Sequence, residues 1–236
     1  MMRQILIRTG IIIITVVLGV VYIILSPLDY KRKISDLLMR LWAAMLLFIS
    51  GVKTKITGLE NIDKKNSYIV VSNHQSQFDI PVMIRYLPLT VRMLAKKELF
   101  RIPIFGWAMY LAGHISLDRG KGKKALKSLK EASEKIRKMK LSIIVYPEGT
   151  RSPDGKVQNF KKGAFRLGLE TRLPVLPVSI IGSREIMPKD SLIINKGEIK
   201  IIVGNPIITE NLEKAELKNL SDTVRNEIIK NMEVKN

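Results

Sequence analysis

The sequence of 236 residues contains no cysteine and only two histidines. Without cysteine, a disulfide framework, a thiolate metal site and a cysteine nucleophile are excluded. Two histidines alone argue against a zinc site, so no metal centre is expected. Acidic residues are also few, 21 against 40 lysines and arginines, which gives a net charge of +19 and a pI near 10.1. This excess of positive charge predicts an anionic partner, which is nucleic acid, an anionic membrane surface or a phosphorylated substrate.

Aromatic residues make up 6% of the chain, and neither an aromatic-studded RNA-binding signature nor a basic arm is found. The basic residues are spread along the chain, and the N-terminal segments are strongly apolar. An anionic membrane surface is therefore a better partner for the positive charge than nucleic acid, and no nucleic-acid binding is expected. With 46% apolar residues, the chain can bury one substantial core, which predicts one main domain plus an appendage.

The N-terminal region holds two apolar segments. Residues 9–26 carry no charge and are rich in Ile, Val and Leu, and their number lies at the lower limit for crossing a bilayer core, which takes roughly 17–25 residues. A second segment begins at Ile34 and is uncharged over residues 41–52. Pro27 and the basic triplet 31–33 separate the two segments, so we expect two helices.

We expect these two helices to form a membrane-associated hairpin. Basic residues flank both ends and fill the turn, which argues against a clear positive-inside orientation and favours a monotopic hairpin in one leaflet. One span with an interfacial second helix, and a buried hairpin in a soluble bundle, remain alternatives. A cleaved signal peptide is rejected, because no small-x-small cleavage site follows the first segment. The predicted boundary gives an anchor of residues 1–53 and an α/β domain of residues 54–236.

Strands and helices alternate after the predicted anchor. Short apolar, β-branched runs bounded by polar residues predict strands over residues 55–58, 68–71, 90–96, 114–118, 142–146, 175–181, 193–194 and 199–203. Apolar residues at helical spacing predict helices that begin near Pro81 and cover residues 123–140, 163–170 and 217–228. Alternation of this kind predicts an α/β fold with a mixed, largely parallel sheet flanked by helices, preceded by the two-helix hairpin.

One of the two histidines lies between a predicted strand and a predicted helix, in the stretch 72–79. Such a turn at the end of a sheet is where α/β proteins tend to place their sites. Asp79 follows His74 by five residues, and the two residue types suit a general base and the carboxylate that orients it. Ser76 lies in no Gly-x-Ser-x-Gly elbow, so no protein nucleophile is evident. We therefore expect the proton to come from a substrate hydroxyl.

The same stretch has a structural interpretation. Ser76 and Asp79 match a capping box, in which the two side chains satisfy backbone donors at the start of a helix. His74 would then be an ordinary turn histidine.

The stretch 73–79, Asn-His-Gln-Ser-Gln-Phe-Asp, resembles the Asn-His-x4-Asp block of the glycerolipid acyltransferases. Three further stretches resemble the other blocks of that family and follow in the same order. They are residues 113–119, Gly-His-Ile-Ser-Leu-Asp-Arg; residues 146–152, Tyr-Pro-Glu-Gly-Thr-Arg-Ser; and residues 173–178, Leu-Pro-Val-Leu-Pro-Val. The residues of the first and third blocks look most like those of the 1-acylglycerol-3-phosphate (lysophosphatidic acid) acyltransferases of this family. The resemblance covers residues 58–181.

The resemblance implies transfer of a fatty acyl group from an acyl thioester to the sn-2 hydroxyl of lysophosphatidic acid, which gives phosphatidic acid for phospholipid biosynthesis. Acyl transfer would be direct, with His74 as base and Asp79 as its orienter. It implies no cofactor, since the thioester, carried by acyl carrier protein or coenzyme A, is a co-substrate. It also implies an inner membrane location with the catalytic domain facing the cytoplasm. Amphipathic pieces in residues 97–107 are candidates for the wall of an acyl pocket, with plain core as the default for Trp107.

The resemblance assigns Arg119 and Arg151 to the phosphate of the acceptor, and Glu148 to binding or ordering the same region. Gly149 and Thr150 of the same stretch complete the candidate phosphate site, and Lys96 and Lys97 are weaker candidates, because lysines are abundant in the chain. A guanidinium grips a phosphate through its planar fork, and Gly149 allows the backbone to approach closely. For an isolated motif, a Glu–Arg pair on a surface turn is the alternative interpretation. For the whole chain, the alternatives are acylation of glycerol-3-phosphate or another lysolipid, and a non-catalytic membrane-anchored lipid-binding protein.

Overall fold

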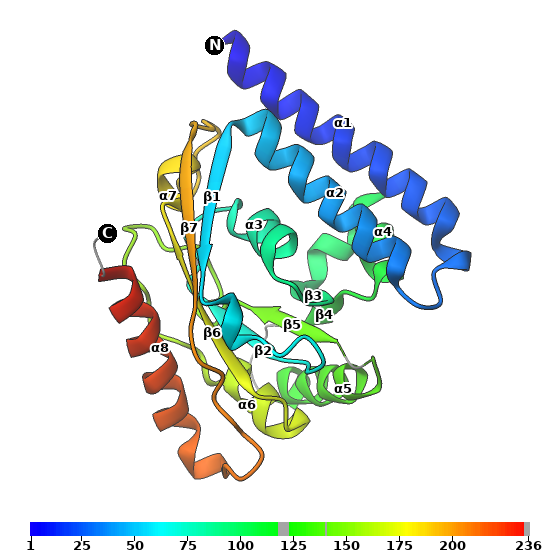
Figure 1. The fold of residues 1–236 in the computed structure, drawn as a ribbon. Coiled ribbons are helices and arrows are strands. Elements are labelled where there is room, and N and C mark those ends of the chain that lie inside the picture. The colour runs from blue at the N-terminus through cyan, green and yellow to red at the C-terminus, as the bar shows by residue number, and fades with distance from the viewer. Residues whose placement is uncertain (118–122, 140, 234–236) are drawn as a thin grey trace.

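A computed structural model of the chain describes residues 1–117, 123–139 and 141–233. Its centre is a seven-stranded sheet in the order β1-β7-β6-β2-β5-β3-β4 (Figure 1). The strands are β1 (Val52–Thr57), β2 (Ile69–Ser72), β3 (Val91–Lys96), β4 (Ile115–Leu117), β5 (Ser142–Val145), β6 (Val175–Ile181) and β7 (Gly197–Val203). Strands β6 and β7 pair antiparallel, and the other neighbours pair parallel. The predicted mixed, largely parallel sheet is confirmed.

The direction of the strands brings several loops to one edge of the sheet. Strand β2 runs parallel to β5 and β6, whereas β7 and its parallel neighbour β1 run the opposite way. The carboxyl ends of β2, β5 and β6 therefore lie at the same edge as the beginnings of β1 and β7. We call this edge the motif edge, because the stretches 72–79 and 146–152 both follow strands that end there.

Helices cover both faces of the sheet (Figure 1). One face carries α1 (Met2–Leu25), α2 (Lys33–Ser50), α3 (Asp79–Tyr86) and α4 (Phe105–Ala112), and the other carries α5 (Lys123–Met139), α6 (Lys162–Thr171) and α8 (Leu217–Glu233). Alternate residues of a strand contribute to the two cores: Val70 lies in the core under α3, and Ile69 and Val71 lie in the core under α6 and α8. Because both faces are covered, the central strands are fully buried, which explains their continuous apolar runs.

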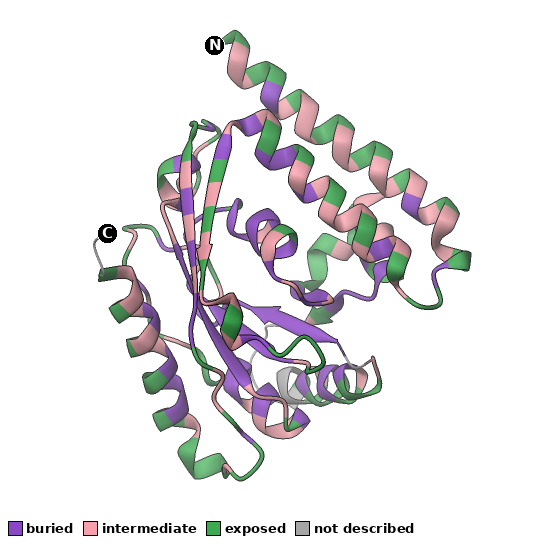
Figure 2. Cartoon of the chain, in the orientation of Figure 1, coloured by how far each residue is buried: buried purple, intermediate pink, exposed green. Residues whose placement is uncertain are grey.

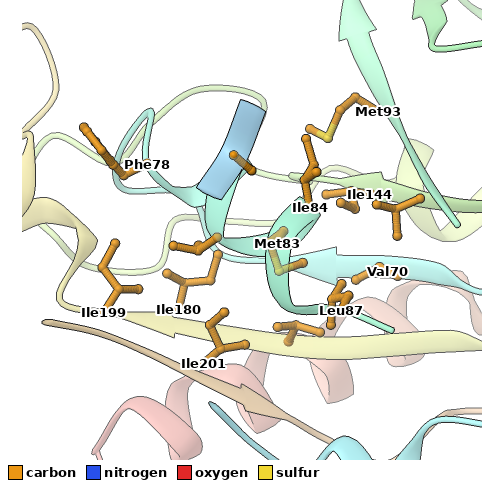
Figure 3. Close-up of a cluster of buried hydrophobic side chains, with 14 of the residues drawn as sticks. Val70, Phe78, Met83, Ile84, Leu87, Met93, Ile144, Ile180, Ile199 and Ile201 are labelled. Atoms are coloured by element: carbon orange, nitrogen blue, oxygen red, sulfur yellow. The ribbon is translucent and has the colours of Figure 1, made fainter. Parts of the chain in front are cut away.

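The core on the α3 side is dense and almost wholly aliphatic. Figure 3 shows Met83 of α3 and Leu87, which follows the helix, lying over the sheet, with Ile180 and Ile201 on neighbouring strands beneath them. Since all four side chains are almost completely buried, the helix is held rigidly against the sheet. The beginning of α3, which carries Asp79, is therefore fixed in place.

The predicted hairpin is present as α1 and α2, which are joined by a short turn. Its inner side belongs to the protein core, since Ile7, Ala43 and Leu47 are buried in the same cluster as the sheet residues. Its outer side is apolar and open: Ile13 is 55% exposed, and Figure 2 shows α1 as largely exposed or intermediate. Among the described residues, Met2–Leu28 is the one helical stretch that is long and apolar enough to cross a membrane.

Most predicted boundaries shift by one or two residues or slightly more, and two larger differences concern β1 and residues 193–194. Strand β1 begins at Val52, earlier than the predicted 55–58, because α2 ends at Ser50 and Gly51 adopts a positive φ of 73° that terminates the helix. The strand predicted over residues 193–194 is wrong. The carbonyl of Ile194 accepts hydrogen bonds from the side chains of Arg3 and Gln4, so α1 takes the place of a neighbouring strand.

A buried ion pair joins α2 to the sheet. The side chain of Arg92 is fully buried, and its Nη1 donates to Asp36 Oδ1 at 2.6 Å. Asp36 Oδ2 accepts a hydrogen bond from the hydroxyl of Thr90, and Arg92 also donates to Ser35 Oγ. A buried guanidinium requires such a partner, because an uncompensated charge in the interior is strongly unfavourable.

We expect Asp36→Ala to lower the free energy of unfolding by about 3 kcal/mol, since it leaves Arg92 buried without its counter-charge. Denaturant unfolding of the detergent-solubilised protein measures this loss. The matched control is Lys55→Ala, which breaks an ion pair with Glu198 in which the lysine side chain is 70% exposed, and which should cost at most about 1 kcal/mol. Equal losses in the two variants would show that Arg92 does not depend on Asp36.

Candidate active site

The two motif stretches meet at the motif edge because they follow neighbouring parallel strands. Val71 of β2 is in register with Val145 of β5, and His74 follows the one strand as Glu148 follows the other. The backbone N–H of Ser152 donates to the carbonyl of His74 at 2.7 Å, which ties the two loops together.

On the other side of β2, the side chain of Asn73 fixes the histidine turn to β6. Its Nδ2 donates to the carbonyl of Ile180, and the N–H of Ile180 donates to its Oδ1, both at 2.8 Å. His74 thus stands on a turn that is anchored to both neighbouring strands. A turn held in this way keeps the imidazole at a fixed position.

The predicted pair of His74 and Asp79 is formed. His74 Nδ1 and Asp79 Oδ2 are 2.7 Å apart, with the carboxylate fully buried and the imidazole side chain 16% exposed. Because a carboxylate accepts, this geometry assigns the proton to Nδ1 and leaves the lone pair of Nε2 available. The arrangement suits a general base that is reached from solvent on one side.

The two side chains of the capping-box interpretation do accept from backbone donors at the start of α3. Ser76 Oγ accepts from the N–H of Phe78 at 3.2 Å, just before the helix begins at Asp79. Asp79 Oδ2 accepts from the N–H groups of Gln75 and Ser76, at 2.8 and 2.9 Å. One carboxylate oxygen therefore shapes the turn and orients the imidazole at once.

Tyr146 packs against one face of the His74 imidazole. Its ring stacks on that of His74, with centroids 4.1 Å apart and an interplanar angle of 16°. Burial, and secondly the negative charge of Asp79, raise the pKa of Tyr146 well above its ordinary value, so the phenol stays neutral. Among the described residues, neither the Tyr146 hydroxyl nor Asp79 Oδ1 has a hydrogen-bond partner, although both atoms are buried. The ring therefore acts on His74 through packing.

Glu148 uses both of its oxygens on backbone groups. Oε1 accepts from the N–H of His74 at 2.7 Å, and Oε2 accepts from the N–H of Gln158 at 3.1 Å. Burial raises the pKa of Glu148, while these two hydrogen bonds act in the opposite direction. The geometry gives this carboxylate an ordering role, since it holds the histidine turn to the loop that follows β5.

Arg151 lies beside that turn, one residue before the Ser152 N–H that contacts His74. Its side chain is 22% exposed, and its Nη2 lies 3.9 Å from Asp190 Oδ1. Thr150 is exposed. A cation of this kind, loosely paired with an exposed carboxylate, is available to an anionic ligand.

Gly149 makes room for a second cation. It has a positive φ of 79°, and a Cβ built on it would lie 2.5 Å from Nζ of Lys161. The ammonium of Lys161 therefore lies close over the backbone of the motif. A glycine at this position serves both the conformation of the turn and the approach of Lys161.

Two predicted phosphate ligands are not placed with this group. Arg119 lies outside the described residues. Lys96 ends β3, two strands away from β2 in the sheet, and its side chain, 61% exposed, lies 3.8 Å from Glu98. Neighbouring strands are about 4.8 Å apart, so Lys96 stands at the same edge but roughly 10 Å along it from the histidine strand.

The other histidine is unsuited to proton transfer. His114 is buried, and its Nδ1 accepts a hydrogen bond from the N–H of Met93 at 2.9 Å. Burial, and secondly the charges of Arg92 and Arg32, lower its pKa to about 3. A group with this pKa is a poor base near pH 7, which leaves His74 as the imidazole for the chemistry.

Sequence reasoning missed two residues of the site, Tyr146 and Lys161. Tyr146 is the first residue of the motif 146–152, but a motif does not show that its ring stacks on a residue 72 positions away. Lys161 was one of 40 basic residues, and no spacing distinguished it from the rest. Trp107, expected in the core by default, is 57% exposed on α4.

We expect Asp79→Asn to lower kcat by about 10²-fold, because the amide keeps an acceptor for the turn but loses the charge that stabilises the imidazolium. The Michaelis constants should change little, since Asp79 is buried behind His74. The matched control is Asp222→Asn on the exposed side of α8, which should leave kcat unchanged. A wild-type kcat in Asp79→Asn would exclude the orienting role.

The chain is similar to known proteins in sequence and in fold. Residues 53–181 match the family model described as Acyltransferase. The chain is 36% identical over 224 residues to the chloroplastic 1-acyl-sn-glycerol-3-phosphate acyltransferase BAT2 of Brassica napus, covering 94% of this chain and 62% of that protein. It is 33% identical over 214 residues to a 1-acyl-sn-glycerol-3-phosphate acyltransferase of Saccharomyces cerevisiae, covering 89% of this chain and 70% of that one. The chain thus spans less than two thirds of the length of the Brassica protein.

The same likeness is found in three dimensions. The crystal structure of the 1-acyl-sn-glycerophosphate (LPA) acyltransferase PlsC from Thermotoga maritima matches with a TM-score of 0.83 and 29% sequence identity, over 100% of this chain and 98% of that one. The family match falls on the residues that hold the His74–Asp79 pair and the loop after β5. Sequence, fold and site geometry together show that the chain belongs to the acyltransferase family.

Proposed function

We propose that the protein transfers a fatty acyl group from an acyl thioester to the sn-2 hydroxyl of 1-acylglycerol-3-phosphate, which yields phosphatidic acid. The observation that carries the proposal is the 2.7 Å contact between His74 and buried Asp79, which leaves Nε2 of the imidazole available as far as the described residues are concerned. The names of the Brassica, yeast and Thermotoga relatives as 1-acyl-sn-glycerol-phosphate acyltransferases support the choice of acceptor.

In the reaction, Nε2 of His74 removes the proton of the acceptor hydroxyl while its oxygen attacks the thioester carbonyl. The tetrahedral intermediate collapses to the ester and expels the thiolate, which takes the proton back from the imidazolium. Asp79 stabilises that imidazolium, and Tyr146 keeps its plane fixed. Base catalysis of this kind contributes about 10²–10⁴-fold, and alignment of the two substrates contributes much of the remainder.

The acceptor phosphate binds at the motif edge, where Arg151 and Lys161 present two cations close to the histidine turn. Arg119, which follows β4, is assigned to the same phosphate through the family resemblance. Glu148 orders the loop through its backbone contacts. Lys96 has a secondary role in binding the phosphate, because it lies at the same edge of the sheet.

The acyl chain occupies an apolar cavity of about 150 Å³ between the hairpin and the sheet. Its walls include Leu18 and Gly19 of α1, Ile80 and Ile84 of α3, and Phe105. Ile80, one of its wall residues, follows Asp79 directly in α3. A cavity lined by apolar side chains suits the alkyl chain of a fatty acyl group.

The hairpin holds the enzyme on a lipid surface. Acceptor and product are lipids, and moving an alkyl chain into water costs about 0.8 kcal/mol per CH₂. The exposed apolar side of α1 provides a contact with the leaflet. Lys31 in the turn and Lys33 at the start of α2 are exposed, so anionic head groups would pair with them. We place the protein on the cytoplasmic side of an inner membrane, as a monotopic protein, because acyl thioesters are supplied from the cytoplasm.

An assay of the purified full-length protein tests the proposal. It measures release of phosphatidic acid from lysophosphatidic acid with acyl-coenzyme A and with acyl carrier protein as donors, over several chain lengths. We expect turnover with no added cofactor. Glycerol-3-phosphate serves as the competing acceptor, and faster turnover with it would reassign the substrate. Binding of lysophosphatidic acid without turnover by either donor would favour a lipid-binding protein instead.

A further inference from the structure

A loop at the motif edge carries two large apolar residues in the open. It joins α7 (Ser183–Ile186) to β7 and includes residues 188–196. Leu192 is 65% exposed and Ile193 is 57% exposed, and they follow each other directly. Exposing two neighbouring aliphatic side chains to water costs free energy in proportion to their uncovered apolar area.

The loop is held in place by α1. The N–H of Ile194 donates to Oε1 of Gln4 at 2.9 Å, and the carbonyl of Ile194 accepts from Gln4 Nε2 and from Arg3 Nη1, both at 3.0 Å. Ile194 itself is buried in the core under α3. Leu192 and Ile193 are therefore held next to the first turn of α1, the helix whose outer side is apolar.

On its other side, the same loop reaches the candidate phosphate site. Asp190, at a positive φ of 63°, lies 3.9 Å from Arg151. Since β7 runs opposite to β2, the loop before it lies at the edge where the histidine turn lies. One loop thus joins the beginning of α1 to the cation proposed to hold the acceptor.

Basic residues flank the apolar pair. Lys196 is exposed and lies against Gly51, and Lys189 precedes Asp190. Arg3 lies between the loop and the end of α2, since its Nη2 donates to the carbonyl of Ser50. An apolar tip with cations around it matches the boundary of a bilayer, where alkyl groups lie beneath anionic head groups.

We propose that residues 188–196 form a second membrane contact, in which Leu192 and Ile193 enter the lipid surface next to α1. The inference rests on the proposed action at a membrane and specifies which further part of the chain touches it. Its consequence is that Arg151 lies at the level of the lipid head groups, where the phosphate of a lysophospholipid is already found.

The lack of cysteine makes a direct test possible, because one introduced thiol is a unique labelling site. We would label full-length Ile193→Cys with an environment-sensitive fluorophore and add vesicles of phosphatidylcholine and phosphatidylglycerol. The matched control is Ile208→Cys. Ile208 is 63% exposed and follows β7, which ends at the opposite edge of the sheet. Ile13→Cys on the outer side of α1 reports binding of the hairpin.

We expect a blue shift with vesicles for the labels at residues 13 and 193, and no shift at residue 208. In addition, the double variant Leu192→Ser/Ile193→Ser should raise the KM for lysophosphatidic acid in vesicles several-fold and leave the KM for a short-chain soluble analogue unchanged. A shift at residue 13 without one at residue 193 would overturn the loop contact while the membrane part of the proposed function stands. No shift at either position would overturn both. A shift at residue 193 that needs no vesicles and grows with protein concentration would identify a second copy of the chain as the partner, and would also overturn the inference.

Discussion

Replacing His74 by alanine should lower acyl transfer to lysophosphatidic acid by at least about 10²-fold and by as much as about 10⁴-fold. The variant removes the one imidazole that is both partly exposed and oriented by a carboxylate. The other histidine does not replace it, because burial lowers the pKa of His114 to about 3. Initial rates with saturating donor and acceptor measure the loss.

Binding of lysophosphatidic acid separates this loss from a loss of structure. The proposed phosphate site lies on the loop after β5, and the turn at His74 is held by backbone contacts that alanine retains. Equilibrium binding of the acceptor to His74→Ala should therefore match that of the wild type. If the variant kept wild-type turnover, the proposed base would be excluded.

The second large effect concerns Arg151. Arg151→Ala should weaken transition-state binding of the acceptor by about 2–5 kcal/mol, which corresponds to a roughly 30- to 5000-fold fall in kcat/KM for lysophosphatidic acid. The 22% exposure of the side chain places the expectation toward the lower end of this range. Arg151→Lys should recover only part of the activity, because a point charge lacks the planar fork that matches a phosphate.

A matched control exists on α6. Arg166 is 33% exposed and is paired with Glu170, so Arg166→Ala removes a comparable cation from the other face of the sheet. We expect it to leave kcat/KM for the acceptor unchanged. If Arg151→Ala raised only the KM of the donor, Arg151 would belong to the donor site.

Much of the fold followed from the sequence because its signals are local. The runs at Ile69–Ser72 and Val175–Ile181 are apolar except for one serine each, as expected for strands that are buried on both faces. The strand predicted at residues 193–194 failed for a non-local reason. Its backbone groups bond to side chains of α1 that are 190 residues away in the sequence, and no local pattern reveals such a partner.

The candidate site was predictable to the extent that its chemistry lies in contiguous motifs. The spacing of His74 and Asp79 was enough to suggest their contact, because a short turn before a helix brings residues five positions apart together. The stack of Tyr146 on His74 depends on the register of β2 with β5, which a sequence does not state. The cation at Lys161 depends on the path of the loop around Gly149, for the same reason.

The attachments of the hairpin have a mechanical consequence. Asp36 joins α2 to β3 through Arg92, and Gln4 joins α1 to Ile194 in the loop before β7, so both helices are fastened to the α/β domain at separate points. We expect this double attachment to keep the active site at a constant height relative to the hairpin. On a membrane, the height of His74 above the lipid would be a fixed property of the molecule. A lysophospholipid would then have to diffuse laterally to the enzyme and rise to that height, and the distance it rises would set how much of its alkyl chain leaves the bilayer.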